Sequence, residues 1–507
     1  MHTLKYIFIY MLLLISTFSY SQTLIGTRSN YSGSNSLSLN PALLSTSYLY
    51  ADFSLFNFGI TAFNDFAYIN GSDFRDFLFK RDHIFPTYEV NGYRTNFLIY
   101  DNIDKKPNNI YESLDLNLLS LMFSINDNHA IGFSLNTRVY TSGTNIPWEI
   151  PELCTFRTKN NPEYRGHYQS SEMRVASLEW MEVALSYSRK IYERYLNRVD
   201  AGITAKYLIG YSAVVGNINN LDYEILENSV DDYDSIVVNK INADLAYSLP
   251  INYDESFTSQ GVFDNSMVRG NGLAFDLGFT YTRKKEVTIR NMRRVSGCIR
   301  PKTDYLWKAG VSFMDVGFIN FKNNALDNSI VNDGGSVFDI SSFDHVDSFN
   351  DMIEIMSTTY YGDPNASVVG NSFRIGLPTT IRFHFDYNFR KNIYVNATFI
   401  QPIRLMEYSV EAAPHIILEP RFESVLCDFS IPVTLRDYRF FMVGANLRLG
   451  PLTVGTQNLA SYLGLGKVNG MDLFVSLKFN FNKGSCDDDK FDACWSADFG
   501  NKRNRRK

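Results

Sequence analysis

The sequence of 507 residues has few cysteines and prolines, five and 15, and beyond its first 21 residues it lacks a long uninterrupted apolar run. Since a membrane-spanning helix needs about 20 mostly apolar residues, a helical membrane protein is excluded. Basic charge is not in excess, because the formal net charge is −6. Nucleic-acid binding is therefore not expected. No linker rich in Pro, Gly and Ser divides the chain, which favours one large domain.

An export signal is expected at the N-terminus. Residues 1–21 combine a short positive region, an apolar run over 7–15, and small residues at Ser19 and Ser21. This is the order of parts in a secretory signal cleaved before Gln22. No Cys follows the apolar run, so a lipid anchor is not expected. An exported chain without a membrane helix is either soluble or spans the membrane as a closed β-barrel.

Period-two alternation predicts an all-β protein. One face is apolar and uncharged, the interleaved face polar, small and charged with both signs, in segments at 131–138, 181–187, 201–209, 273–281, 309–313, 382–389, 393–399, 441–449 and 472–481. A soluble sandwich shows the same alternation with its apolar face turned inward. Periodicity alone does not separate the two architectures.

Three features favour a transmembrane antiparallel barrel. The alternating segments run to about nine to eleven residues, the length of a tilted strand that crosses the hydrocarbon layer. Tyr residues recur near segment ends, where an aromatic girdle lies. Short turns at 126–128, 390–392 and 450–451 alternate with long insertions at 62–110, 143–172, 213–242, 252–268 and 320–372. We expect about 14 strands, with roughly 12 to 16 allowed.

The insertion at 320–372 contains one expected helix. Its apolar residues Val346, Phe349, Ile353 and Met356 follow helical spacing. A helix packed on the barrel rim and a functional plug are the two alternatives.

A short motif precedes the first expected strand. Asn40, Pro41 and Ala42, followed by Leu43, resemble the N-terminal hatch motif of the long-chain fatty-acid transporter (FadL-like) barrels and of the PorV-type barrels. Pro41 removes an amide donor and restricts Asn40, so the segment leaves any strand ladder there. The motif suits a plug that enters the barrel from the periplasmic side. An ordinary cap and turn leading into the first strand stays open.

Further segments look like an uncharacterised family of Bacteroidota-type outer-membrane barrels, namely 272–281, 308–319, 377–380 and 399–402. The resemblance covers most of the chain beyond the signal. It implies a fold and the cell outer membrane, but no substrate. The expected organisation is a signal at 1–21, a hatch at 22–47, a barrel at 48–482 with long extracellular loops, and a periplasmic tail at 483–507.

Little in the sequence points to chemistry. Cys486 and Cys494 flank an acidic segment short enough for a disulfide, with unpaired thiols as the next alternative and a metal site last. Arg382, His384 and Asp386 alternate on one polar face as a lumen charge cluster, which either guides a polar solute or satisfies charges across the interior. No metal, nucleotide or nucleophile motif is present. No cofactor, metal or enzymatic activity is expected.

The last alternating segment indicates how the chain is inserted. The segment Leu473–Phe481 resembles the closing strand that the outer-membrane assembly machinery reads. Residues 482–507 follow it and end in a basic run, which is expected to be solvated. Outer-membrane lipid and that machinery are the expected partners.

Two functions are compatible with such a barrel. In the first, a hatch near Asn40 closes a lumen that takes up a small hydrophobic ligand, although the polar inward face counts against a wholly apolar conduit. In the second, the barrel is a scaffold or docking subunit of an outer-membrane secretion or assembly complex, with a protein partner. Long loops rich in Asn, Asp and Tyr motivate the second hypothesis.

Overall fold

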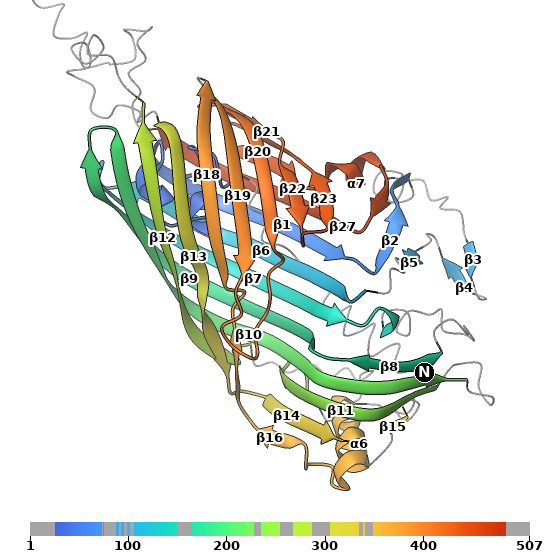
Figure 1. Cartoon of the computed structure of the whole chain (residues 1–507). Helices are drawn as coiled ribbons and strands as arrows, with labels where there is room; N and C mark the ends of the chain where they lie inside the picture. Colours follow the sequence, from blue (N-terminus) through green and yellow to red (C-terminus); the bar gives the residue numbers. More distant parts are fainter. Residues whose placement is uncertain are drawn as a thin grey trace, which may run out of the picture.

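The protein is an antiparallel β-barrel with a short N-terminal segment inside it (Figure 1). The computed structural model describes residues 26–72, 75, 88–90, 93–95, 99–101, 106–150, 165–227, 235–253, 267–285, 305–333, 338–339, 348–390 and 392–482. The expected signal and the tail beyond Asn482 lie outside these residues. No helix among the described residues is long and apolar enough to cross a membrane.

Strands make up most of the described chain. Their bounds are β1 Leu49–Asn64, β2 Ala67–Asn70, β3 Tyr88–Val90, β4 Tyr93–Thr95, β5 Ile99–Asp101, β6 Asn108–Ser124, β7 His129–Ile146, β8 Gly166–Ser170, β9 Met173–Arg194, β10 Asn197–Leu226, β11 Ser235–Ser248, β12 Gly270–Lys284, β13 Tyr305–Phe321, β14 Ala325–Asn332, β15 Phe338–Asp339, β16 Val368–Gly370, β17 Phe373–Gly376, β18 Thr380–Arg390, β19 Ile393–Pro402, β20 His415–Glu423, β21 Cys427–Ser430, β22 Val433–Arg436, β23 Phe440–Val443, β24 Ala445–Leu449, β25 Leu452–Thr456, β26 Lys467–Val468 and β27 Gly470–Asn482. The helices are η1 Gly33–Ser38, α2 Leu43–Thr46, α6 Phe349–Tyr361 and α7 Leu459–Leu463.

Within the described residues the barrel has 14 antiparallel strands, which confirms the expected number. Each of the pairs β17 with β18, β21 with β22 and β23 with β24 forms one interrupted strand. The first and last strands close the barrel, because β1 pairs with β27 from Leu49↔Asn482 to Phe63↔Gly470. Closure leaves no free sheet edge at this seam, and a closed barrel satisfies its backbone groups within lipid.

Burial shows which face of the strands points outward. Apolar side chains of one face lie exposed on the barrel, among them Leu185 at 64% and Leu273 at 69%. Their charged neighbours Lys206 and Asp276 are buried on the other face. This arrangement is the reverse of a soluble sandwich, and an exposed apolar band is the surface that a barrel presents to lipid.

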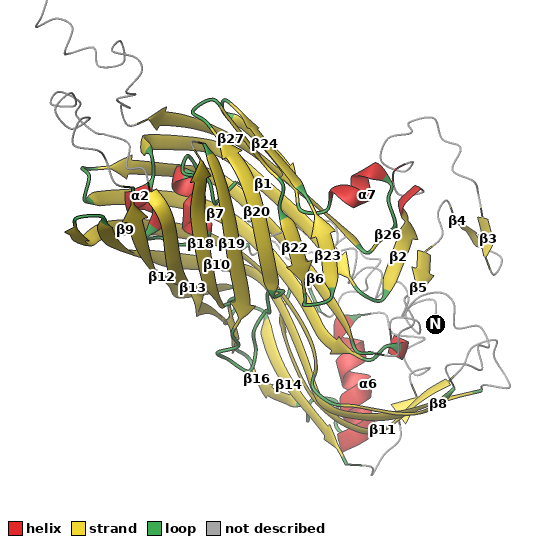
Figure 2. Ribbon diagram, turned by 45° about the horizontal axis from the view of Figure 1, so that its top comes forward, coloured by secondary structure: helices red, strands yellow, loops and turns green. Residues whose placement is uncertain are grey.

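The two ends of the barrel differ. The end that contains η1 and α2 has short turns, such as those between β9 and β10 and between β24 and β25; we call it the hatch end. The opposite end, which we call the loop end, carries α6 (Figure 2). There β10 continues well beyond β12, and its extension pairs with β11 from Ala213↔Ser248 to Leu226↔Ser235.

The extension of β10 corrects one sequence prediction. The range 213–242 was expected to be an insertion, but most of it is strand in β10 and β11. Its Asn-rich alternation lacks a continuous apolar outer face. A strand that projects past the hydrocarbon layer needs no such face, so composition favoured a loop where a strand continues.

The helix expected in 320–372 is confirmed as α6. Ser348 caps it: the Ser348 side chain accepts from the Asp351 amide, and the Asp351 side chain accepts from the Ser348 amide. Gly362, with φ of 72°, ends the helix. The buried Ile353 packs in a cluster with Tyr247, so α6 is a packed part of the loop-end structure. Val346 lies outside the described residues.

Candidate functional site

The lumen is built as three layers, which can be followed along the inner face of β10. Near the hatch end, Arg198 and Asp200 contact the N-terminal segment. Thr204 and Lys206 come next and line a cavity. Leu208 and Val215 follow, inside the largest apolar cluster. We name these the hatch layer, the charged layer and the apolar layer.

In the hatch layer, Asn40, Pro41 and Ala42 lie buried against the inner wall. The Asn40 side-chain amide donates to the carbonyl oxygens of Phe279 at 3.1 Å and Val311 at 3.2 Å. Its oxygen accepts from the Ala42 amide at 2.9 Å. Asn40 thus shapes the local turn and at the same time bonds to the backbone of two wall strands, β12 and β13.

Two glycines make room for this motif. Gly202 on β10 and Gly278 on β12 are register partners. A Cβ at Gly202 would overlap the backbone of Pro41, and one at Gly278 would overlap the Asn40 side chain. The wall therefore presents a strip without side chains, on which Asn40 and Pro41 are seated.

Hydrogen bonds attach the rest of the described N-terminal segment, residues 26–47, around the wall. Ser45 Oγ donates to Asp200 at 2.7 Å, and Ser312 Oγ donates to the Leu39 carbonyl at 2.7 Å. The Ser34 amide donates to Asp52 at 2.7 Å. These partners come from β10, β13 and β1, so the segment, which we call the hatch, is tied to separated parts of the barrel.

The charged layer is a connected set of ion pairs. Arg138 on β7 contacts Asp115 at 2.7 Å, Asp315 at 2.9 Å and Glu182 at 3.4 Å. Lys206 reaches Asp276 at 2.9 Å and Asp315 at 2.5 Å. The six residues come from β6, β7, β9, β10, β12 and β13. All except Asp115 have side chains with exposed fractions of at most 6%.

A bulge in β13 places Asp315 in this layer. Asp315 has a φ of 57°, an uncommon backbone conformation for a residue other than Gly. The register of β12 and β13 shifts at the same level, between Phe275 and Leu277. The Asp315 amide donates to Asp276 at 2.7 Å, which holds the bulge.

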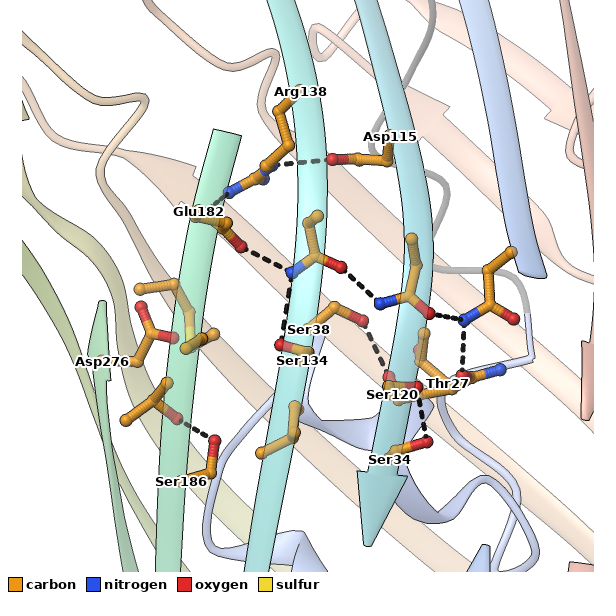
Figure 3. Close-up of a pocket in the computed structure, with 18 of the residues that line it drawn as sticks. Thr27, Ser34, Ser38, Asp115, Ser120, Ser134, Arg138, Glu182, Ser186 and Asp276 are labelled. Atoms are coloured by element: carbon orange, nitrogen blue, oxygen red, sulfur yellow. Dashed lines mark hydrogen bonds and ion pairs between the residues drawn. The ribbon is translucent and has the colours of Figure 1, made fainter. Parts of the chain in front are cut away.

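A ladder of asparagines joins the hatch to the charged layer. The Asn57 side-chain amide donates to Asn35 of the hatch and to Asn117, each at 3.1 Å. Asn117 donates to Asn136, which donates to Glu182 at 2.8 Å. Figure 3 shows this chain of bonds running across neighbouring strands away from Glu182. We call Asn35, Asn57, Asn117 and Asn136 the Asn ladder.

A cavity of about 130 Å³ lies between the hatch and the charged layer. The Asn ladder lines it together with Asp115, which keeps 29% of its side chain exposed. Most other lining residues are Ser, Thr or charged residues, and Phe474 supplies an aromatic side chain. Leu37, Ala184 and Met314 are also in the lining, so the cavity presents both polar groups and apolar surface.

The apolar layer closes the lumen beyond the cavity. Trp180, Leu208, Ile319 and Phe321 belong to one buried cluster with Val410 and Ala412. The last two come from the segment 403–414 between β19 and β20, which turns inward. Backbone bonds join it to the wall, from the Gly376 amide to the Tyr408 carbonyl at 2.8 Å and from the Val410 amide to the Gly376 carbonyl at 3.2 Å.

Tyr408 anchors the same segment by its side chain. Its hydroxyl donates to Asp327 Oδ1 at 3.0 Å. Burial, and then the nearby Asp327 carboxylate, raise the pKa of Tyr408. The hydroxyl therefore remains a donor at neutral pH, and the inward segment stays attached to β14.

Arg382, His384 and Asp386 all lie on the lumen face of β18, but each has different surroundings. Arg382 donates to the Ser38 carbonyl of the hatch. Asp386 accepts two bonds from Arg421, at 2.8 and 2.7 Å. His384 lines a small cavity of about 20 Å³ under the hatch. These contacts attach the hatch and balance charge across the wall.

Cys486 and Cys494, where a disulfide is expected, lie outside the described residues. Among the described residues, Cys427 is a free thiol. Among the described residues, no group of three or more His, Cys, Asp or Glu side chains is placed to hold a metal ion.

The sequence did not predict that the residues of the charged layer form one connected set of ion pairs. Arg138, Glu182, Lys206 and Asp276 stand on the polar faces of their segments, but their pairing depends on the register between strands. Asp315 carried a usable signal. It continues the spacing of Ala309, Val311 and Phe313, so a regular strand would turn its charge toward lipid. A charge at such a position predicts a bulge.

Comparison with known proteins gives one family. The sequence profile of a family of unknown function, DUF5723, matches residues 31–457. This range includes the Asn-Pro-Ala motif, the Asn ladder and the charged layer. No curated protein matches the chain.

Several solved barrels are similar to this chain. The TodX deltaS2S3 mutant monoaromatic hydrocarbon channel is 9% identical over 91% of this chain and 97% of its own, with a TM-score of 0.39. The Ralstonia pickettii toluene transporter TbuX is 8% identical over 92% and 98%, with a TM-score of 0.29. A Pseudomonas aeruginosa FadL homologue is 9% identical over 87% and 93%, with a TM-score of 0.22. The barrel assignment rests on the strand pairing described above.

Proposed function

We propose that this chain, which belongs to the DUF5723 family, is an outer-membrane barrel that passes a small solute through a lumen gated by its hatch. The observation that carries the proposal is the seat of Asn40 and Pro41 on Gly202 and Gly278, with a cavity directly beyond it. The exposed apolar band supports a place in a membrane.

The way the hatch is bound supports a gate. Its contacts with the wall include hydrogen bonds, such as those of Ser34, Asn40 and Ser45. A buried ion pair also joins Arg28 to Glu419, and Tyr31 and Leu44 belong to a buried apolar cluster with wall residues. A neutral hydrogen bond contributes about 0.5–1.5 kcal/mol net, and one to a charged group about 1.5–3 kcal/mol. Because the attachment is divided among separate contacts, the hatch can leave its seat in steps.

Asn40→Ala tests the gate. The substitution removes both bonds to the wall and the bond that shapes the turn, so the hatch should leave its seat more often. We expect the purified wild-type barrel to conduct little in a planar lipid bilayer. Asn40→Ala should open several-fold more often.

Ser38→Ala is the matched control from the same segment. The Ser38 side chain is exposed and bonds only to the Asn35 carbonyl within the hatch, so its conductance should stay at the wild-type level. A folded Asn40→Ala barrel that conducts like wild type would mean that the hatch is a fixed structural plug.

The small hydrophobic ligand and the PorV-type relationship remain expectations from the sequence resemblance. Among the described residues, no feature favours a scaffold subunit over passage of a solute. Gentle detergent extraction followed by affinity purification separates these functions. A stoichiometric protein partner would support the scaffold, and a lone barrel supports the gate.

A further inference from the structure

We propose that the cavity between the hatch and the apolar layer binds a small neutral polyol. This inference rests on the proposed function and names the class of solute that such a barrel would take. It is drawn from the size of the cavity, the spare hydrogen-bonding capacity of its lining and the balance of charge around it.

Size sets the first limit. A cavity of about 150 Å³ in another protein accommodates benzene, and the cavity described here measures about 130 Å³. A ligand on the order of six to eight non-hydrogen atoms therefore fits without rearrangement of the wall. Glycerol and erythritol have this size, and so does toluene, which makes polarity the property that distinguishes them.

The lining can accept hydrogen bonds from hydroxyl groups. The amide hydrogens of Asn57, Asn117 and Asn136 are all donated within the protein, and the Asn57 oxygen accepts two bonds. Asn117 Oδ1 and Asn136 Oδ1 each accept one bond and keep the capacity for a second. Asn57, Asn117 and Asn136 are only partly buried and line the cavity. The hydroxyl groups of a polyol can donate to these two oxygens. An apolar ligand would leave this accepting capacity unused in a dry site, which is unfavourable.

Asp115 adds an acceptor. Arg138 uses one of its oxygens, at 2.7 Å, and 29% of the side chain stays exposed. Charge-assisted hydrogen bonds to a carboxylate are about twice as strong as neutral ones. Two hydroxyl groups of one polyol can therefore donate, one to the open oxygen of Asp115 and one to Asn117 Oδ1.

The charges around the cavity favour a neutral ligand. Arg138 and Lys206 each contact more than one carboxylate, and carboxylates outnumber cations among these pairs. An anion would enter a net negative site, which is unfavourable. A cation would have the open oxygen of Asp115 as its carboxylate contact, close to the Arg138 guanidinium, and would have to lose its own water.

Trp180 offers a built-in reporter. It belongs to the apolar layer and contacts two residues that line the cavity: its indole N–H lies 3.4 Å from Glu182, and the Arg138 guanidinium lies 5.2 Å from the ring centre. A ligand that contacts Glu182 or Asn136 changes the electrostatic field at this ring. The chain has four Trp residues, so Trp180→Phe identifies the signal that belongs to this site.

The experiment titrates the purified full-length barrel in detergent with glycerol, erythritol and toluene while tryptophan fluorescence is followed. We expect a saturable change with erythritol, absent in Trp180→Phe, and no saturable change with toluene. Asn136→Leu should weaken erythritol binding at least tenfold. Asn219→Leu, an exposed position on β10 away from the cavity, should bind like wild type.

Folding is checked separately, and the milder variant Asn136→Ser replaces Asn136→Leu if the latter does not fold. A saturable response to toluene but not to the polyols would overturn the proposal in favour of an apolar ligand. A response only to putrescine, added as a cationic probe, would overturn it in favour of a cation. No saturable response to any probe would also overturn it.

The outcome is separable from that of the gate. If Asn40→Ala opens the barrel but erythritol does not bind, the solute class is wrong and the gate stands. If erythritol binds and Asn40→Ala leaves conductance unchanged, the site stands and passage through the hatch is wrong.

Discussion

Single glycines determine how closely the hatch approaches the barrel wall. At Gly202, the atoms that an added Cβ would meet belong to the backbone of Pro41 and Ala42. Backbone cannot rotate away as a flexible side chain can, so the hatch itself would have to move. The hatch, and not the geometry of strand β10, therefore requires a glycine at this position.

Gly202→Ala should therefore displace the hatch. Overpacking of this kind costs about 1–3 kcal/mol, and this strain falls on the seat of Pro41. We expect faster cleavage within residues 26–47 by an added protease, and higher conductance, than in wild type.

Gly216→Ala is the control on the same strand. A Cβ there would meet only Leu245 Cδ1, at an ordinary 3.8 Å. Cleavage in this variant should match wild type. Equal protection of the hatch in both variants would show that Pro41 does not depend on the Gly202 seat.

At the residue scale, the sequence predicted positions better than partners. Asn40, Pro41 and Ala42 were predicted to form a hatch motif from their residue types and their position before the first strand. The glycines that receive them stand 160 and more residues further on (202 − 42 = 160), and only the fold brings them together. The same holds for Asp386, whose partner Arg421 lies on another strand.

Each barrel strand faces lipid on one side and the lumen on the other. On β9, Leu185 is exposed on the outside, while Ala184 and Ser186 line the cavity on the inside. Alternation along 181–187 predicted this division correctly, because neighbouring strands repeat it. Alternation failed where a strand leaves the membrane, as in the β10 extension, and where Asp315 interrupts it.

Leu185→Arg tests the outward face. A charged residue on the lipid side near the middle of the membrane costs about 2–4 kcal/mol, and the cost falls to about 0–1 kcal/mol near the interfaces. We expect a corresponding loss in the free energy of folding into lipid vesicles, measured by urea titration.

Tyr195→Arg is the comparison on the turn between β9 and β10, where the side chain is 87% exposed. This variant should fold nearly as wild type does. Equal stability of the two variants would mean that Leu185 does not face hydrocarbon.

At the scale of the whole molecule, one seam closes the barrel. The last strand, β27, lies between β25 and β1, and Val475 pairs with Val454 on one side and Phe58 on the other. The sequence predicted the closing strand itself, because the alternating segment at 473–481 resembles one. The actual partner strands became known only from the structure.

Closure predicts a heat-dependent gel shift. An intact barrel keeps its compact fold in detergent until it is boiled, so unheated wild-type protein should migrate faster than boiled protein. Val475→Pro removes an amide donor in the middle of a paired strand and should abolish the fast form. Val475→Thr keeps the β-branched shape and the amide, and should retain it. A wild-type protein without any shift would contradict a closed barrel.

The cavity has a barrier on each side, the hatch toward one end and the apolar layer with its inward segment 403–414 toward the other. Under the proposed function, such a chamber takes up one small molecule per cycle, and a continuous path for water or ions exists only while both barriers are open together. A cell can then hold many copies of the protein without making its envelope leaky to detergents or toxic compounds. The number of copies, and not the width of a pore, would set the rate of uptake.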